Sequence, residues 1–234
     1  MIFNNKCFIH IPRTSGTHIE GLIAGRHKIY TSWPTPNLES LFGLFYDREY
    51  SKEKQRWYTL QHLTFLEIQD FILQGWIHQR NYDFFSIIRN PYDRIVSLYH
   101  HWGGDLRFGT FDYFLNILDR LEINSYEHKG INVDRGDFNH LNMTDKIRDC
   151  KYHFLPQSLY LCDENKKIKA EIIRFGETEK ISSKIETPYI FNNDTREKKV
   201  HFLNKGRIER IYKLYQVDFE NFKYDKKFSL NSKL

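Results

Sequence analysis

The chain has 234 residues, of which 40% are hydrophobic and 16% aromatic, a composition that argues against intrinsic disorder and allows a sizeable buried core. Its 35 basic and 30 acidic residues give a formal charge of +5, which suits an anionic ligand but is too small to indicate nucleic-acid binding by itself. The length suits one α/β domain, with or without an added subdomain.

The sequence contains no apolar run long enough to span a bilayer. Its N-terminal residues, Met1–Lys6, lack the basic-then-apolar pattern of a signal peptide. The three cysteines form neither a metal-type pair nor a disulfide framework, although a bridge between Cys150 and Cys162 stays open. We therefore expect a cytoplasmic protein with reduced thiols.

The first half of the chain alternates short apolar runs with helical patterns. Strands are expected at Lys6–Ile11, Trp57–Leu60 and Asp83–Ile88. Helices are expected at Thr17–Ala24, Phe65–Trp76 and Pro91–Trp102, the last with proline in its first turn. This alternation predicts an α/β fold, a three-layer sandwich with a central parallel sheet.

Capping residues indicate where two of these helices begin. Thr17 and Glu20, and again Thr64 and Glu67, have the spacing of a capping box. Gly25 is expected to end the first helix.

The second half is less regular. A helix is expected at Phe111–Leu121, a strand at Ala170–Phe175 and one amphipathic helix at Arg207–Phe222, whose aromatic stripe we interpret as core packing. We expect a single domain, 1–234, with an insertion at 104–151 that faces the substrate.

Ligands of parallel sheets bind beyond the carboxyl ends of the strands, so the loops after the first three predicted strands should converge. This placement brings Arg13, His62 and Arg89 near one another. No His, Cys or Asp cluster has the spacing of metal ligands, and no metal is expected.

The first of these loops has the composition of a phosphate site at a helix start. It comprises Pro12, Arg13, Thr14, Ser15, Gly16, Thr17 and His18. Backbone N–H groups, hydroxyls and one permanent cation would together bind one phosphate. The loop lacks the first glycine and the lysine of the ATPase signature, which disfavours a nucleoside triphosphate. An ordinary strand-to-helix turn explains this loop equally well on its own.

A second segment, "RNPYDRIVS" at 89–97, follows the third predicted strand. Arg89 would bind a phosphate through two N–H groups, and Ser97 would donate to the same group. The alternative is an Arg89–Asp93 pair with Ser97 facing solvent.

Together the two segments resemble sulfotransferases that use 3'-phosphoadenosine 5'-phosphosulfate (PAPS), especially the carbohydrate-directed branch that includes heparan sulfate 2-O-sulfotransferases. In that family a P-K-T-x-x-[ST]-like loop binds the 5'-phosphosulfate, and an R-[ND]-P-x-x-R-x-x-S segment binds the 3'-phosphate. The resemblance implies that residues 12–18 hold the 5' end and that Arg89 and Ser97 hold the 3'-phosphate. It also implies a sulfotransferase fold like that of phosphate-loop NTPases.

The resemblance implies a direct in-line transfer that releases 3',5'-bisphosphate (PAP) without a metal. Arg13 stands where the family has a lysine that stabilises the leaving phosphate. The piece "QHLTF" at 61–65 resembles G-H-[LV]-[ST]-[FY], in which some members carry their catalytic histidine, so His62 is the expected base. Family likeness favours a sugar hydroxyl as acceptor, with a phenol or a peptide tyrosine left open.

Several alternatives stay open. His18, His100, His101 or a carboxylate are rival bases, although surface exposure fits His100 and His101 better. Arg196 and Lys198 or Lys199, in a basic segment at 192–202, match a late loop that closes over the nucleotide, although such runs are more often solvated surface. The rival functions are a non-catalytic PAP- or nucleotide-binding protein, a phosphate-loop kinase and a nucleic-acid-binding protein.

Overall fold

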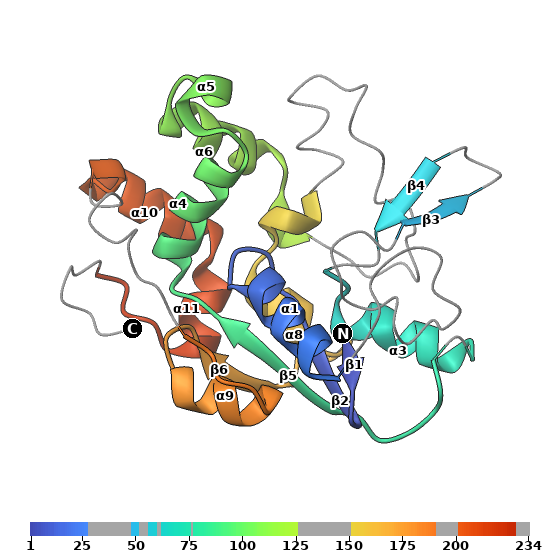
Figure 1. The fold of residues 1–234 in the computed structure, drawn as a ribbon. Helices are drawn as coiled ribbons and strands as arrows, with labels where there is room; N and C mark the ends of the chain where they lie inside the picture. The colour runs from blue at the N-terminus through green and yellow to red at the C-terminus, as the bar shows by residue number, and fades with distance from the viewer. Residues whose placement is uncertain are drawn as a thin grey trace.

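A computed structural model describes residues 1–27, 48–51, 56–59, 62–75, 77–125, 151–190 and 201–227 (Figure 1). Arg196 and Lys198 lie outside these residues, as do Gln61 and 126–150 of the expected insertion. Within the described ranges, no helix has both the length and the apolar character that crossing a bilayer requires.

The central sheet has four strands in the order β1-β2-β5-β6. These are β1 (Ile2–Phe3), β2 (Lys6–Ile9), β5 (Asp83–Ile88) and β6 (Glu171–Arg174). β2, β5 and β6 run parallel, and β1 pairs antiparallel with β2. The register pairs Ile9 with Ser86 and Ile88 with Arg174, so the carboxyl ends of the parallel strands share one edge. The parallel strands predicted at the first and third apolar runs are thus confirmed.

Helices cover both faces of this sheet, as Figure 1 shows. α1 (Gly16–His27) and α9 (Thr178–Ile185) pack on one face, against Phe8, Phe85 and Ile87. α3 (Phe65–Leu73) and α8 (Gln157–Leu161) pack on the other face, with Cys7, Ile9 and Ile88 in their core. Successive strand residues point to opposite faces, so the near-continuous apolar runs of β2 and β5 serve both layers. The predicted three-layer architecture is confirmed.

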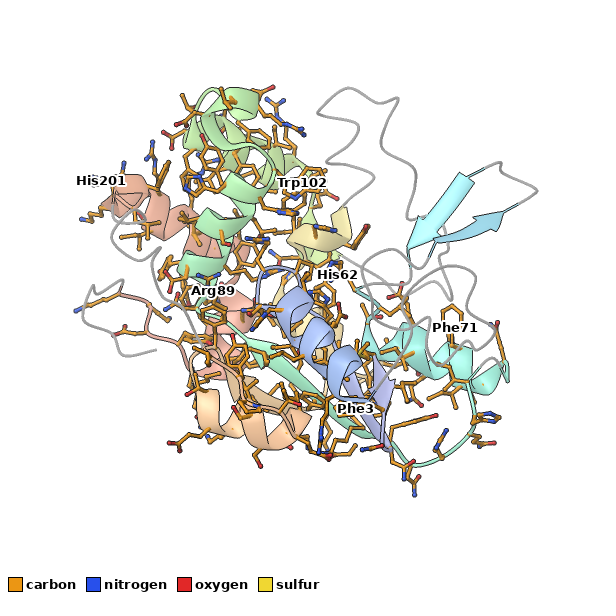
Figure 2. All side chains as sticks on the ribbon, viewed as in Figure 1. Phe3, His62, Phe71, Arg89, Trp102 and His201 are labelled. Carbon is orange, nitrogen blue, oxygen red and sulfur yellow. The ribbon has the colours of Figure 1, made fainter. Side chains whose placement is uncertain are left out.

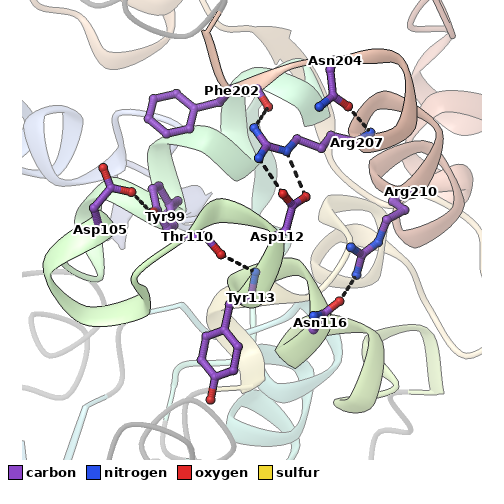
Figure 3. A network of polar contacts seen from close by, with 10 residues as sticks. All are labelled: Tyr99, Asp105, Thr110, Asp112, Tyr113, Asn116, Phe202, Asn204, Arg207 and Arg210. Carbon is purple, nitrogen blue, oxygen red and sulfur yellow. Dashed lines mark hydrogen bonds and ion pairs between the residues drawn. The ribbon is translucent and has the colours of Figure 1, made fainter.

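A second helical cluster continues the core beyond the sheet edge. It contains α4 (Pro91–His101), α5 (Gly104–Phe108), α6 (Phe111–Arg120), α10 (Lys205–Leu214) and α11 (Gln216–Phe222). Arg207 of α10 donates to both carboxylate oxygens of Asp112 on α6, at 2.9 and 2.6 Å (Figure 3). Arg210 donates to Asn116 one turn along. These contacts fix α10 across α6 and close the helical cluster.

The strand predicted at 57–60 does not join the parallel sheet. β4 (Arg56–Thr59) pairs antiparallel with β3 (Arg48–Ser51) in a separate two-stranded sheet. An apolar run four residues long specifies an extended conformation but not its partner, which explains why the prediction was wrong.

The first predicted helix begins earlier and ends later than expected. Ser15 O accepts from the N–H of Ile19, so α1 begins at Gly16 and continues past Gly25 to His27. Thr17 therefore lies inside the helix, where it is exposed, and the predicted capping box with Glu20 is wrong. The capping box at Thr64 and Glu67 is present, with both reciprocal hydrogen bonds.

Two further boundaries differ from prediction. The single helix expected at 207–222 is two helices that meet at Tyr215, where φ is −122° and ψ is 24°. Its apolar stripe packs in the core as predicted, with Ile211, Tyr215 and Phe219 buried. The described part of the expected insertion forms α5, α6 and a short 3-10 turn at Ile123–Ser125. A second 3-10 turn at Lys151–Phe154 precedes α8.

Cys162 is a free buried thiol, so the disulfide bridge between Cys150 and Cys162 that the sequence left open does not form.

Candidate functional site

The loop between β2 and α1 is wound into an anion-binding shape. Arg13 and Ser15 have φ values of +68° and +73°, in the left-handed region that non-glycine residues rarely occupy. Thr14 is fully buried, and its hydroxyl donates to Ile11 O at 2.8 Å, which closes the turn. Alternating left-handed residues before a helix start direct successive N–H groups to one side. The loop therefore offers a concave set of donors at the positive end of α1.

The ring of His10 lies directly beneath this loop. A Cβ on Gly16 would lie 1.9 Å from His10 Cδ2, so only glycine fits there. On its other side, His10 Nδ1 lies 3.0 Å from a carboxylate oxygen of Glu20, which is fully buried. Burial lowers the pKa of His10 to about 3, and the N-terminal amino group and Arg13 act in the same direction. A neutral imidazole thus supports the loop from below.

This packing gives a direct stability prediction. Gly16→Ala should lower the free energy of unfolding by about 2–3 kcal/mol, because the new methyl group overlaps a buried ring. Gly21→Ala in the same helix is the control, since a Cβ there has nothing within 4 Å; it should be neutral or stabilising by up to about 1 kcal/mol. Urea denaturation measures both. Equal stability of the two variants would refute the close contact between His10 and the loop.

Arg89 follows β5 directly and is anchored through its backbone. Gln157 accepts from Arg89 N–H and donates to Arg89 O, both at 2.8 Å. Gln157 N–H in turn donates to the buried carboxylate of Asp218, which also accepts from Ser158. This side-chain network joins the ends of β5, α8 and α11, and it fixes the point where the Arg89 side chain begins.

The guanidinium of Arg89 is buried, and within the described residues it forms no ion pair with a carboxylate, although the charge of Asp93 acts on it from nearby. Its side chain is 8% exposed, and its guanidinium carbon lies 4.4 Å from the ring centre of Phe175. Nη1 donates to Arg13 O at 3.1 Å, whereas Nε makes no hydrogen bond within the described part of the chain. Burial lowers the pKa of Arg89 to about 10, and the nearby charge of Arg13 also lowers it, against the raising effect of Asp93. A buried cation with an unused donor is a binding site for an anion.

The Arg13 side chain lies against α4. Its Nε donates to Ser97 Oγ at 3.1 Å, and its Nη1 donates to His101 Nδ1 at 3.2 Å. Burial lowers the pKa of Arg13 as well. Ser97 therefore faces the loop cation and not bulk solvent, so the solvent-facing alternative for Ser97 is excluded. His101 is exposed, as expected, and its contact with Arg13 was not predicted from the sequence.

His62 lies beside the loop, although its strand is not in the parallel sheet. Figure 2 shows Arg89 and His62 near the N-terminal end of α1. His62 is buried, with φ +68°, and its Nδ1 donates to His10 O at 2.8 Å. Because a carbonyl only accepts, the hydrogen of a neutral His62 is on Nδ1 and the lone pair is on Nε2. This is the tautomer that a general base requires.

Aromatic rings surround His62. His10, Tyr152 and His153 contribute ring centres at 4.2, 6.3 and 4.9 Å from that of His62. Trp102 lies 5.5 Å from His153. Tyr152, His153 and Trp102 are partly exposed, so a ligand next to the proposed base can contact these rings.

Arg94 was missed as part of the site. It is almost fully buried, and it donates to the carbonyls of Pro12, Leu155 and His153 at 3.0, 2.9 and 3.0 Å. One α4 side chain therefore fixes the start of the phosphate loop and the backbone beneath the aromatic rings. The repeated arginine of the "RNPYDR" segment was the signal for it.

The remaining predicted residues lie at the rim of the loop. Ser15 Oγ accepts from Tyr189 OH at 3.0 Å, and the ring of His18 lies 5.6 Å from that of Tyr189. Thr17 and His18 are exposed. The described residues contain no group of three His, Cys, Asp or Glu side chains that could hold a metal ion.

Comparison with known proteins identifies the chain by one match. A family model described as "Sulfotransferase family" matches residues 8–187, which is 180 of the 234 residues and includes Arg13, His62, Arg89 and Ser97. Neither the curated proteins nor the solved structures contain a significant match.

Proposed function

The chain belongs to the sulfotransferase family, and we propose that it transfers the sulfuryl group of PAPS to a hydroxyl of a saccharide, with Arg13 and His62 as the reacting side chains. The family establishes the enzyme class and implies PAPS as donor. The residue roles and the acceptor are our proposal.

The observation that carries the proposal is the pair of arginines at the loop, of which Arg13 is half-buried and Arg89 is buried. Arg13 and Arg89 are joined by the hydrogen bond from Arg89 Nη1 to Arg13 O, yet each comes from a different strand end. Two cations beside a helix start suit a ligand with two separate anionic groups. PAPS has such groups at its 5' and 3' positions, whereas an ATP-like ligand has no 3'-phosphate to engage Arg89.

The proposed reaction is a direct in-line displacement. The acceptor oxygen forms a bond to sulfur while its proton moves to His62 Nε2, and the bond between sulfur and the bridging oxygen of the 5'-phosphate breaks. The electron pair stays on that oxygen, where Arg13 and the N–H groups of the loop stabilise the negative charge. The hydrogen bond to His10 O keeps the hydrogen of neutral His62 on Nδ1, so Nε2 is the nitrogen that accepts the proton.

Two observations support a saccharide acceptor. The piece around His62 resembles carbohydrate sulfotransferases, and Tyr152, His153 and Trp102 offer flat surfaces on which a sugar ring packs. A phenol would pack on the same rings, so phenols are the competing acceptor class in the experiment below.

Transfer from labelled PAPS to a panel of acceptors tests the proposal. The panel contains unsulfated and sulfated oligosaccharides, simple phenols and tyrosine peptides, each at millimolar concentration. We expect transfer to at least one saccharide with kcat/KM at least about tenfold above that for any phenol or peptide, which corresponds to about 1.4 kcal/mol of discrimination. Preferential sulfation of a phenol would overturn the assignment of a saccharide as the acceptor. PAP binding without transfer to any acceptor would favour a non-catalytic PAP-binding protein.

A further inference from the structure

Arg13 is held by two side chains of the same helix. Its Nε donates to Ser97 and its Nη1 donates to His101. Ser97 and His101 are four residues apart on α4, so they lie on one helix face, one turn from each other. The guanidinium is therefore bound at two of its three nitrogens by one rigid element.

Two bonds from one helix fix the plane of the guanidinium as well as its position. A guanidinium has five N–H donors that all lie in one plane. It therefore forms hydrogen bonds to an anion only when the anion lies near that plane. Nη2 makes no hydrogen bond within the described residues, so its donors remain for an anion. A lysine is a point charge and needs no such orientation, whereas an arginine at this position does.

The contact with Arg13 also determines which ring nitrogen of His101 carries the hydrogen. An arginine N–H only donates, so Nδ1 of His101 is the acceptor and carries no hydrogen. The groups that face this ring are Arg13, the ring of His153 stacked at 6.3 Å and 13°, and Trp102 at 6.2 Å. Burial and the charge of Arg13 lower the pKa of His101, which keeps the ring neutral near pH 7.

We propose that His101 is a positioning residue for sulfuryl transfer and that it orients the Arg13 guanidinium toward the leaving phosphate. This orientation lets an arginine act at the position where the motif of the sulfotransferase family has a lysine. The inference rests on the function proposed above. It assigns His101 no contact with the substrate; its effect passes through Arg13.

A double-mutant cycle tests this role. His101→Ala should lower kcat about 10- to 100-fold, because a misoriented cation no longer meets the charge that develops on the leaving group. The KM for PAPS should change less than about threefold. His101→Asn should recover most of the rate, since its Oδ1 replaces Nδ1 as acceptor. His100→Ala is the matched control: this neighbour is exposed and contacts Phe202, and its loss should leave kcat unchanged.

The cycle is completed in Arg13→Lys protein. There His101→Ala should change kcat less than about twofold, because the lysine does not depend on orientation by His101. An equal loss in both backgrounds, or no loss in the Arg13 protein, would overturn the proposal.

A readout that needs no activity separates this inference from the proposed function. In NMR titrations of the unliganded protein, Arg13→Met should raise the pKa of His101. An unchanged pKa of His101 would show that the contact does not exist. If the wild type neither binds PAP nor transfers sulfate, the proposed function fails, and the titration still decides whether His101 holds Arg13.

Discussion

Arg89→Met should weaken PAP binding at least about 100-fold and, at the same time, raise the melting temperature of the unliganded protein. Binding falls because the variant loses charge-assisted hydrogen bonds, each of about 1.5–3 kcal/mol, at a desolvated site. Methionine keeps an apolar stem against Phe175, so the surrounding core is preserved. Calorimetric titration with PAP measures the first effect, and thermal unfolding without ligand measures the second.

The rise in melting temperature follows from the sign of the pKa change. Burial lowers the pKa of Arg89 to about 10 in the folded protein, below its value in the unfolded chain, so the fold disfavours the charged form. Below pH 10 this costs on the order of 3 kcal/mol, and the cost is lost progressively as the pH rises above 10. The lost hydrogen bond to Arg13 O offsets about 1 kcal/mol. The remaining gain of about 2 kcal/mol corresponds to roughly 5 °C for a chain of this size.

Arg120→Met is the control for this experiment. Arg120 is an exposed arginine at the end of α6, and its replacement removes the same charge without touching the loop. It should leave PAP affinity within about twofold at physiological salt, where distant surface charges are screened. An Arg89→Met protein that melts below the wild type and binds PAP normally would show that Arg89 is a structural residue.

His62→Asn should lower kcat about 10²- to 10⁴-fold while PAP affinity stays within about threefold, because a general base is lost and the phosphate loop is not. Asparagine suits this position for two reasons. It tolerates the φ of +68°, and its amide N–H can donate to His10 O in place of Nδ1. The variant therefore removes the base with little change in the fold.

Single-turnover transfer from labelled PAPS, together with a PAP titration, measures the two effects of His62→Asn. His78→Asn is its control, since His78 is exposed and lies before β5, away from the loop. If His62→Asn retained more than about a tenth of the wild-type rate, the proton acceptor would be a different residue. Loss of PAP binding would instead show that His62 supports the loop.

The parts of the fold that were predictable from sequence are those whose signals are local. The strand before Arg89, the helix start at Asn90-Pro91 and the capping box at Thr64 each depend on a few consecutive residues, and the structure has all three. The segment "RNPYDRIVS" predicted that Arg89, at the end of β5, and Ser97, within α4, serve the same binding site. Both in fact lie at the loop of Arg13.

The parts that were missed depend on partners far apart in the chain. Glu20 has the spacing of a capping residue, but its polar neighbour is His10 on a different element. The contact between His101 and Arg13 was missed because the two residues are 88 positions apart in the chain. His62 reached the site although its strand pairs elsewhere, since a hydrogen bond to the backbone of His10 holds it there. Sequence periodicity reports which face of an element is buried, but it does not identify what that face meets.

Titration of the wild-type protein with PAP, 5'-AMP and 3'-AMP tests the central claim most directly, because it asks whether the loop and Arg89 bind one phosphate each. We predict that PAP binds at least about 30-fold more tightly than either monophosphate, a difference of about 2 kcal/mol. At 100 times its dissociation constant, PAP should stabilise the fold by about 2.7 kcal/mol. Equal affinities for PAP and 5'-AMP, or no binding of PAP, would contradict the assignment of Arg89 to the 3'-phosphate.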